Sequence, residues 1–105
     1  MGSNRTRGVA ALLFVLTVTA GAAFAQNSTP DCVEVEGVSR WGAAAFNHWV
    51  TVNNQCARPV HCIVRTDVSP DSHALDVPAG ERREVLTFRG SPARAFTPRV
   101  QCDER

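Results

Sequence analysis

The 105-residue sequence lacks lysine, so all 11 of its basic residues are arginine, and Met1 is its only methionine. It has no G-x-S-x-G segment, which marks the nucleophile of many hydrolases. No two cysteines have the C-x-x-C spacing of zinc and redox sites. Without a methionine beyond Met1, a blue-copper centre would lack its usual axial ligand. We therefore expect neither an enzyme nor a protein that holds a metal or another cofactor.

The N-terminus has the three parts of a secretory signal peptide over residues 1–25. Arg5 and Arg7 make the start positive, and residues 9–24 are apolar or small. Ala23-Phe24-Ala25 then supplies the small residues that signal peptidase requires. This leader indicates that the remainder of the chain is exported.

The mature chain is expected to start at Gln26, after cleavage behind Ala25. We predict a flexible segment over residues 26–31 and a single domain over residues 32–105. No apolar run after the leader is long enough to cross a bilayer, so the mature chain should contain no membrane span. The expected location is secreted or periplasmic.

The charge balance excludes one large class of partner. Removing the leader takes away two of the 11 arginines and none of the 10 acids, which leaves a formal charge of −1. Such a chain has no electrostatic basis for binding nucleic acid non-specifically. The absence of lysine, together with many Ala, Val and Pro residues, is typical of a GC-rich coding sequence and indicates a bacterial source.

Apolar residues of the mature chain recur with a period of two, as in half-buried β-strands. Turn-forming segments separate these runs, namely residues 53–54, 57–59, 69–71, 78–80 and 89–92. The pattern predicts an all-β fold, a small antiparallel β-sandwich that is Ig-like or a partly open barrel, with about six to seven short strands. Gly37 is expected to form a β-bulge. Pro98 cannot donate a ladder hydrogen bond and is expected in an edge or bulged strand.

The four cysteines of the mature chain are predicted to form two disulfides, because exported proteins meet oxidising conditions. The residues on either side of the 57–59 turn can be aligned as a hairpin that places Cys56 opposite Cys62. This alignment favours a Cys56–Cys62 bond and leaves Cys32 to pair with Cys102. The main alternative is a Cys62–Cys102 bond inside the core, where sandwich domains often join their sheets.

The three histidines give no convincing catalytic set. Ser72 and His73 are neighbours in a predicted turn, and neighbours in a turn rarely have the geometry of a triad. His48 shares the parity of the core residues and is expected to be buried. His61 and His73 are expected to be solvated.

Two residues are the best candidates for partner binding. Trp49 has the opposite parity to Val50 and Val52, so it is expected on the outer face of the sheet, where a tryptophan can serve as a contact platform. Arg89 lies in an arginine-bearing turn, and Trp and Arg are the residues that most often anchor interfaces.

The segment Asn54-Gln55-Cys56-Ala57-Arg58-Pro59-Val60-His61-Cys62 has the pattern N-x-C-x-x-P-V-x-C, and a Pro-Ala-Gly turn and a closing Cys102 follow it. In these features the chain resembles small secreted bacterial disulfide-linked β-sandwich proteins of uncharacterised function. The resemblance implies a fold and an exported location. It implies no catalytic residue, cofactor or substrate.

Three classes of function remain. The first is a non-enzymatic secreted or periplasmic module that binds a protein or glycan through loops and an outer sheet face. The second is a secreted inhibitor or toxin-like effector that presents a rigid loop, such as residues 89–93, because disulfide-linked scaffolds suit preorganised loops. The third, a metal-binding protein or small enzyme, has the least support from the residues present.

Overall fold

The computed structural model of the protein describes residues 27–105, so the predicted signal peptide and its cleavage site lie outside the described residues. No helix occurs between residues 27 and 105, and six antiparallel strands form the fold. They are β1 (Val33–Gly42), β2 (Ala45–Asn54), β3 (Val60–Thr66), β4 (Ser69–Val77), β5 (Arg82–Ser91) and β6 (Pro98–Glu104).

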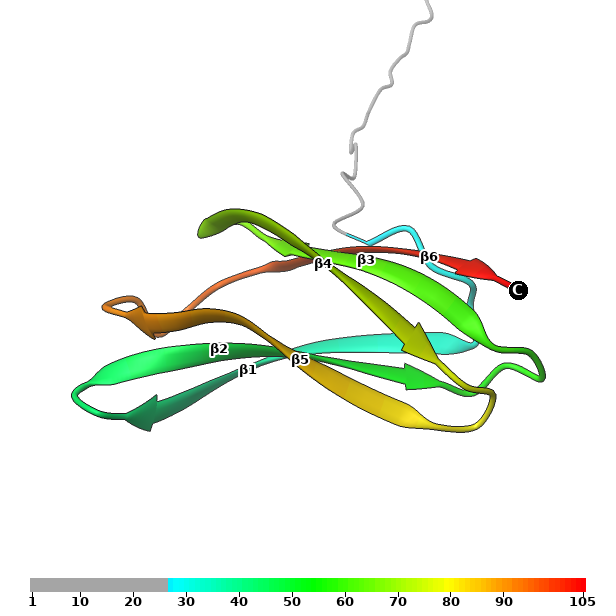
Figure 1. The fold of residues 1–105 in the computed structure, drawn as a ribbon, viewed down its shortest axis with the longest axis horizontal. Helices are drawn as coiled ribbons and strands as arrows, with labels where there is room; N and C mark the ends of the chain where they lie inside the picture. The colour runs from blue at the N-terminus through cyan, green and yellow to red at the C-terminus, as the bar shows by residue number, and fades with distance from the viewer. Residues whose placement is uncertain (1–26) are drawn as a thin grey trace, which may run out of the picture.

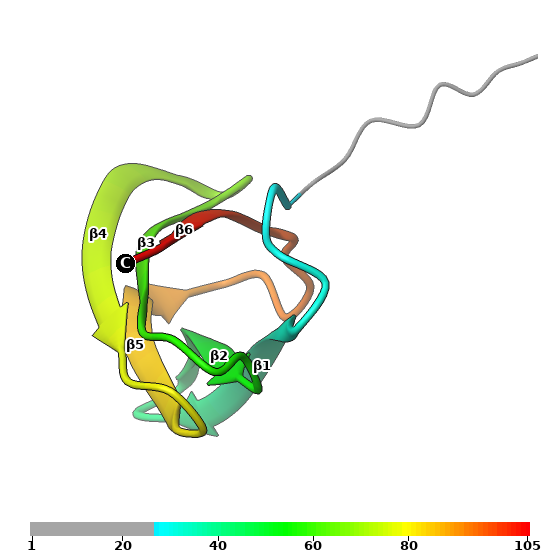
Figure 2. The ribbon, with the colours of Figure 1, turned by 90° about the vertical axis from the view of Figure 1, so that its right-hand side faces the viewer.

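The strands form two three-stranded sheets, with the orders β1-β2-β5 and β4-β3-β6. Figure 1 shows them as two layers, and Figure 2 shows how the layers enclose the interior. Alternate strand positions face inward, and they supply a core built almost entirely from valine and cysteine: Val33, Val50, Val52, Cys56, Val60, Cys62, Val64, Val77, Val100 and Cys102. The predicted all-β antiparallel sandwich with two disulfides is confirmed.

The β1–β2 hairpin closes through the two residues Ala43 and Ala44, whose φ angles are 53° and 65°. Two positive φ values in succession match the type I′ turn, whose twist fits the twist of the paired strands. The strand register runs without a break from Val33 opposite Asn54 to Gly42 opposite Ala45. This hairpin is the longest continuous pairing in the molecule.

Gly37 does not form the predicted β-bulge, because it pairs with Val50 within the unbroken β1–β2 register. Its role is steric. A Cβ atom at this position would lie 3.0 Å from the Phe96 ring and 3.0 Å from the Pro98 ring. The glycine therefore lets the segment before β6 pack directly against the backbone of β1.

The predicted hairpin between β2 and β3 is wrong. These strands belong to different sheets, and residues 55–59 carry the chain from one sheet to the other. Asn54 holds this crossing in place from a fully buried position, because its side chain donates to the Arg58 and Val77 carbonyls at 2.9 and 3.0 Å. Its Oδ1 atom also accepts from the Cys56 amide at 2.9 Å.

The preferred disulfide pairing is wrong for the same reason, since Cys56 does not face Cys62 across a hairpin. The bonds are Cys32–Cys56 and Cys62–Cys102. The alternative Cys62–Cys102 bond is thus confirmed, but it joins β3 to β6 within one sheet instead of joining the two sheets. Cys32 meets Cys56 because β1 begins beside the end of β2, and their Cα atoms lie 5.0 Å apart.

Pro98 begins β6, which is an edge strand, as predicted. The segment before β1 lies along the free edge of β6. The Ser28 amide donates to the Val100 carbonyl at 2.8 Å, and the Ser28 carbonyl accepts from the Cys102 amide at 3.0 Å. The Asn27 Oδ1 atom accepts from the Val100 amide at 2.9 Å. These bonds satisfy edge groups that would otherwise be available to another strand.

Candidate functional site

The outward side of the β1-β2-β5 sheet carries the largest set of candidate binding residues, and we call it the outer face. Two rows of cross-strand neighbours define its centre. In one row Val38, Trp49 and Leu86 lie side by side on β1, β2 and β5. In the other row Thr51 of β2 lies between Glu36 of β1 and Glu84 of β5. The full set is Glu34, Glu36, Val38, Arg40, Asn47, Trp49, Thr51, Asn53, Arg82, Glu84 and Leu86.

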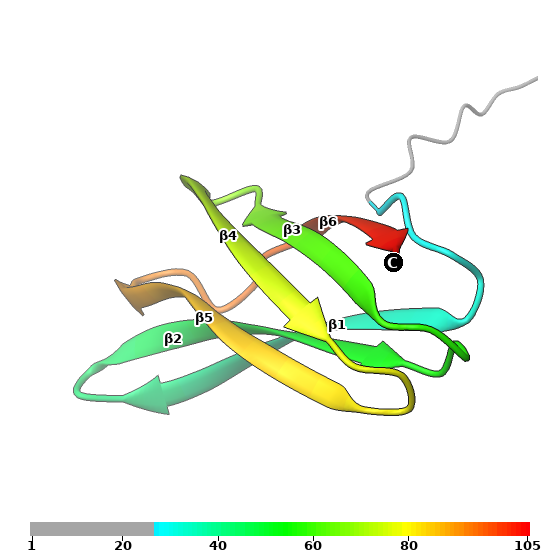
Figure 3. The same cartoon turned by 45° about the vertical axis from the view of Figure 1, so that its right-hand side comes forward.

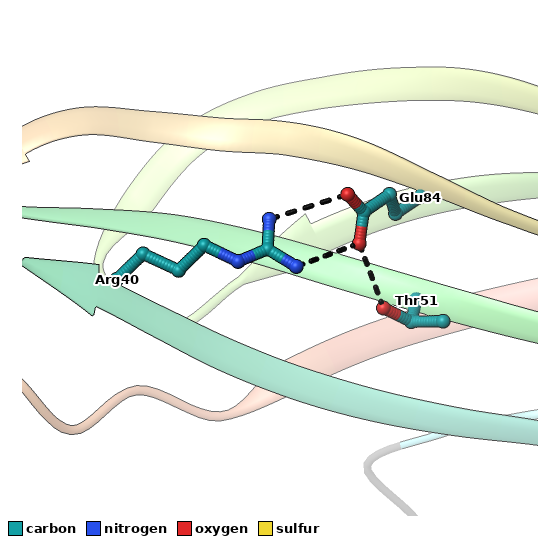
Figure 4. Close-up of polar contacts among 3 residues, drawn as sticks. All are labelled: Arg40, Thr51 and Glu84. Carbon is teal, nitrogen blue, oxygen red and sulfur yellow. Dashed lines mark hydrogen bonds and ion pairs between the residues drawn. The ribbon is translucent and has the colours of Figure 1, made fainter.

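Arg40 reaches across the middle strand to Glu84, as Figure 4 shows. Its Nη1 and Nη2 atoms donate to the two carboxylate oxygens at 3.2 and 3.1 Å, which is a bidentate pair. Thr51 Oγ1 donates to the same carboxylate at 3.4 Å. The hydrogen bonds from Arg40 lower the pKa of Glu84 below its ordinary value of 4.5.

Trp49 lies on the outer face, as its parity predicts, and it is partly buried there. The guanidinium carbon of Arg40 stands 5.0 Å from the centre of the Trp49 ring, within the range of a cation–π contact. The Glu84 carboxylate and the Trp49 ring thus hold one guanidinium together. The result is an aromatic and cationic pair with a fixed position in the middle of the sheet.

Arg89, the second predicted contact residue, is exposed, but it lies near the end of β5 and not in the predicted turn. It lies beside Gly90, whose amide donates to Asn47 Oδ1 at 3.0 Å. Asn47 is two positions from Trp49 along β2. Both predicted contact residues therefore belong to the same three-stranded sheet, and their role in binding remains a prediction.

An open depression of about 540 Å³ lies on the same sheet, next to the Arg40–Glu84 pair. Its lining combines carboxylate, amide, hydroxyl and guanidinium groups: Glu34, Val35, Glu36, Thr51, Asn53 and Arg82. Such a mixture offers hydrogen-bond donors and acceptors side by side, which suits a polar ligand with several hydroxyl or amide groups.

The three histidines differ in how deeply they are buried. His48 is fully buried, as predicted, and its Nε2 atom donates to the Ala93 carbonyl at 2.7 Å. Its ring stacks on Phe96, with centroids 4.2 Å apart. Because a carbonyl can only accept, the proton sits on Nε2, and within residues 27–105 the buried Nδ1 atom has no hydrogen-bond partner. His48 therefore acts as a core residue that fixes the segment after β5.

The other two histidines are less exposed than expected. His61 is a β3 residue whose Nδ1 atom lies 2.6 Å from a carboxylate oxygen of Asp76. His73 lies within β4 instead of in an exposed turn, and its Nε2 atom is buried. The turns expected at residues 69–71 and at Ser72-His73 are absent, because β4 runs without interruption from Ser69 to Val77 and the chain turns at residues 67–68 instead.

One group of potential metal ligands occurs within residues 27–105, formed by Cys32, Cys56 and Glu104. Both sulfur atoms of this group are joined in a disulfide. Metal ions bind the thiolate form of cysteine, so these sulfur atoms are not available as ligands in the oxidised protein.

Sequence reasoning missed Arg40 and Glu84 as members of the site, because they are 44 positions apart and only the sheet order brings them together. It also missed Trp41, which is 66% exposed. A signal for Trp41 was present, since it stands at the start of a run of apolar and small residues that forms the β1–β2 turn.

No protein family, curated protein or solved structure matches this chain. The chain is a small all-β domain of two sheets with two disulfides, a construction typical of proteins that work in oxidising, extracytoplasmic surroundings. In the part of the chain that the structure describes, no helix has the length and apolar character needed to cross a membrane.

Proposed function

We propose that this protein is a non-enzymatic, exported module that binds a protein or a glycan through its outer face. The observation that carries the proposal is the position of Arg40, which is held by Glu84 on one side and by the Trp49 ring beneath it. Arg and Trp are the residues that most often anchor interfaces. Anchors that are already fixed lose little conformational entropy when a partner binds.

The surroundings of this anchor have the composition of a binding surface. Val38 and Leu86 flank the Trp49 ring with apolar area, and both are partly exposed. The polar depression lies next to them and supplies the rim. An apolar centre with a polar rim is the usual anatomy of a protein interface, and an aromatic ring beside hydroxyl-binding groups also suits a sugar.

The experiment is affinity capture with the exported, oxidised protein as bait, together with a glycan array for the carbohydrate arm. Trp49→Ala and Arg89→Ala are expected to lose most of the captured partner, since truncation of an interface anchor typically costs about 2 kcal/mol or more. His61→Ala and His73→Ala are expected to keep it. Each variant is first checked for cooperative unfolding, so that a lost fold is not taken for a lost contact.

A matched control comes from the opposite sheet. Arg65 is an exposed arginine of β3, like Arg89 on β5. Arg65→Ala removes the same charge at a different place, and it should leave capture unchanged. If the folded histidine variants lose the partner while the Trp49 and Arg89 variants keep it, the outer face is not the binding surface.

A second function also has specific support, namely an inhibitor or effector that presents residues 89–93, which are the end of β5 and the two residues after it. Three side chains hold this segment: Asn47 accepts from Gly90, Ser91 Oγ accepts from the Ala93 amide at 3.0 Å, and His48 donates to Ala93. Such a segment is preorganised for insertion into an enzyme cleft. In that case Pro92→Gly, which loosens this segment without touching Trp49, would weaken binding, whereas Trp49→Ala would leave it unchanged.

A further inference from the structure

The end of the β1–β2 hairpin contains no polar side chain. Residues 41–46 have the sequence Trp-Gly-Ala-Ala-Ala-Phe, and we call this segment the hairpin tip. Ala43 and Ala44 form the turn itself and are exposed. Turns with two positive φ values normally use Asn, Asp or Gly, because the Cβ atom of other residues disfavours this conformation. The tip therefore keeps apolar methyl groups where polar or glycine residues are the rule.

Trp41 is the largest apolar group on this tip. It shares a strand face with Val33, which is 7% exposed, yet Trp41 is 66% exposed. The difference arises because the hairpin end reaches past the second sheet, as Figures 1 and 3 show. The Trp41 and Phe46 rings meet edge to face with centroids 4.9 Å apart, so the aromatic pair is held in place at the surface.

The two stretches of chain from the β1-β2-β5 sheet that lie at the tip carry positive charge. Residues 37–48 and 85–96 contain three arginines, Arg40, Arg89 and Arg94, and no Asp or Glu. Both stretches lie at the same end, since Gly90 bonds to Asn47 and the Arg94 carbonyl accepts from Ser39. Asp67 of the β3–β4 turn lies beside the second stretch, because its Oδ1 atom accepts from the Thr97 amide at 2.7 Å. Arg40 is neutralised by Glu84, whereas Arg89 and Arg94 are exposed and form no ion pair within residues 27–105.

We propose that the hairpin tip binds the surface of an anionic lipid bilayer. Tryptophan favours the interface between hydrocarbon and water, where its ring is covered and its indole N–H stays hydrated. The alanine methyl groups add shallow apolar area at the end of the hairpin. Arg89 and Arg94 then lie beside the lipid phosphates, so apolar burial and charge attraction act together, as stable peripheral binding requires.

The chemistry of the tip favours a lipid surface over a pocket in a protein. Beyond Trp41 and Phe46 it offers only glycine and alanine, which give a partner pocket little shape to recognise. The arginines attract any anionic surface and need no particular partner group. This inference goes beyond the proposed function, because it places the module at a membrane and leaves Trp49 free for a partner.

The test uses the exported, oxidised protein and sedimentation with vesicles of phosphatidylcholine alone or mixed with phosphatidylglycerol. We expect binding to the mixed vesicles and at least about tenfold weaker binding to phosphatidylcholine alone. Binding should also weaken in 1 M salt, where the Debye length falls to about 3 Å. The protein has two tryptophans, so in Trp49→Phe the emission of Trp41 should shift to the blue as vesicles bind.

The decisive variant is Ala44→Asp. Aspartate tolerates positive φ better than alanine does, so this change is compatible with the fold, yet it puts a negative charge at the tip. We expect it to abolish binding to vesicles. Ala79→Asp adds the same charge at an exposed alanine of the β4–β5 turn and should have no effect. Trp41→Ala changes an exposed residue outside the turn, and it should also weaken binding to vesicles.

Removal of the basic residues tests the electrostatic part. Arg89→Ala combined with Arg94→Ala should lower affinity for mixed vesicles about tenfold or more, whereas Arg65→Ala on the other sheet should not. The proposal is overturned if wild-type protein does not bind mixed vesicles at low salt, or if Ala44→Asp binds as well as wild type. It is equally overturned if the tip variants lose only a captured protein partner, because the tip would then be a protein contact. Loss of vesicle binding with partner capture intact in Ala44→Asp and Trp41→Ala separates this inference from the proposed function, which makes no use of residues 41–46.

Discussion

Cys62 on β3 lies directly opposite Cys102 on β6, with Cα atoms 4.0 Å apart, so their disulfide joins two neighbouring strands of one sheet. The other disulfide joins the start of β1 to the crossing that follows β2. Neither bond joins a strand of one sheet to a strand of the other. The two sheets are therefore held together by core packing and by the segments that cross between them, and the Cys32–Cys56 bond fixes one of these segments, residues 55–59, to the start of β1.

This arrangement predicts unequal costs for removing the two bonds. Loop entropy alone gives about 3.9 kcal/mol for Cys62–Cys102 and about 3.5 kcal/mol for Cys32–Cys56, from loops of 40 and 24 residues. Cys62 and Cys102 are also both buried, whereas Cys32 is only partly buried. The double variant Cys62→Ala/Cys102→Ala should be the less stable one in urea unfolding. Equal or reversed stability of the two double variants would contradict this.

Gly37→Ala is expected to destabilise the protein by about 1–3 kcal/mol, because the new methyl group would lie 3.0 Å from the rings of Phe96 and Pro98. Phe96 cannot give way freely, since it stacks on the buried His48 ring. Gly42→Ala in the same strand is the control, because its Cβ would meet nothing within 4 Å. Chemical unfolding of both variants makes the comparison, and equal stability would show that the close approach is not as tight as described.

Two substitutions in the β1–β2 turn should make the protein more stable. Ala43→Asn with Ala44→Gly keeps the turn and replaces two alanines at φ 53° and 65° by residues that favour this region. We expect a gain of about 1–2 kcal/mol, seen as a higher urea midpoint with an unchanged slope. The same pair placed at Pro78 and Ala79 in the β4–β5 turn should bring no such gain. A loss of stability at the β1–β2 turn would mean that it does not adopt this conformation in solution.

The Arg40–Glu84 pair predicts a pH dependence with a definite sign. Because the folded-state pKa of Glu84 is lowered, the pair stabilises the protein above the unfolded-state pKa, and this contribution is lost as pH falls through the folded-state pKa. NMR titration should place the Glu84 pKa below 4.5 and should show it rising toward 4.5 in Arg40→Ala. An unchanged Glu84 titration in that variant would show that Arg40 does not hold the carboxylate.

The sequence was sufficient for the all-β class and for the burial of His48, because alternation is a local signal. It misplaced the start of β4 and the end of β5, because turn-forming residues at 69–71 and 89–91 lie within those strands. It was misleading about which strands pair with each other. Residues 55–59 have the length and the proline of a hairpin loop, and nothing in the pattern of β2 or β3 reveals that they join different sheets. The predicted Cys56–Cys62 bond depended on a hairpin between β2 and β3, so it was wrong for the same reason.

The candidate site shows the same limit. The parity of Trp49 placed it correctly on the outward side of its strand, but the neighbours that fix Arg40 above it come from β5, far along the chain. The exposure of Trp41 could not follow from parity either, since Trp41 shares a face with the buried Val33. It depends on where the second sheet ends, which is a property of the tertiary structure.

The most direct measurement of the proposed function is an NMR titration of the oxidised, isotope-labelled protein with the partner that it captures. We expect shift changes centred on the Trp49 indole, the Arg40 guanidinium and Thr51. Little change is expected at Ile63 and Gln101, on the outward side of the other sheet. Shift changes centred on Ile63 and Gln101, with the Trp49 indole unaffected, would contradict it.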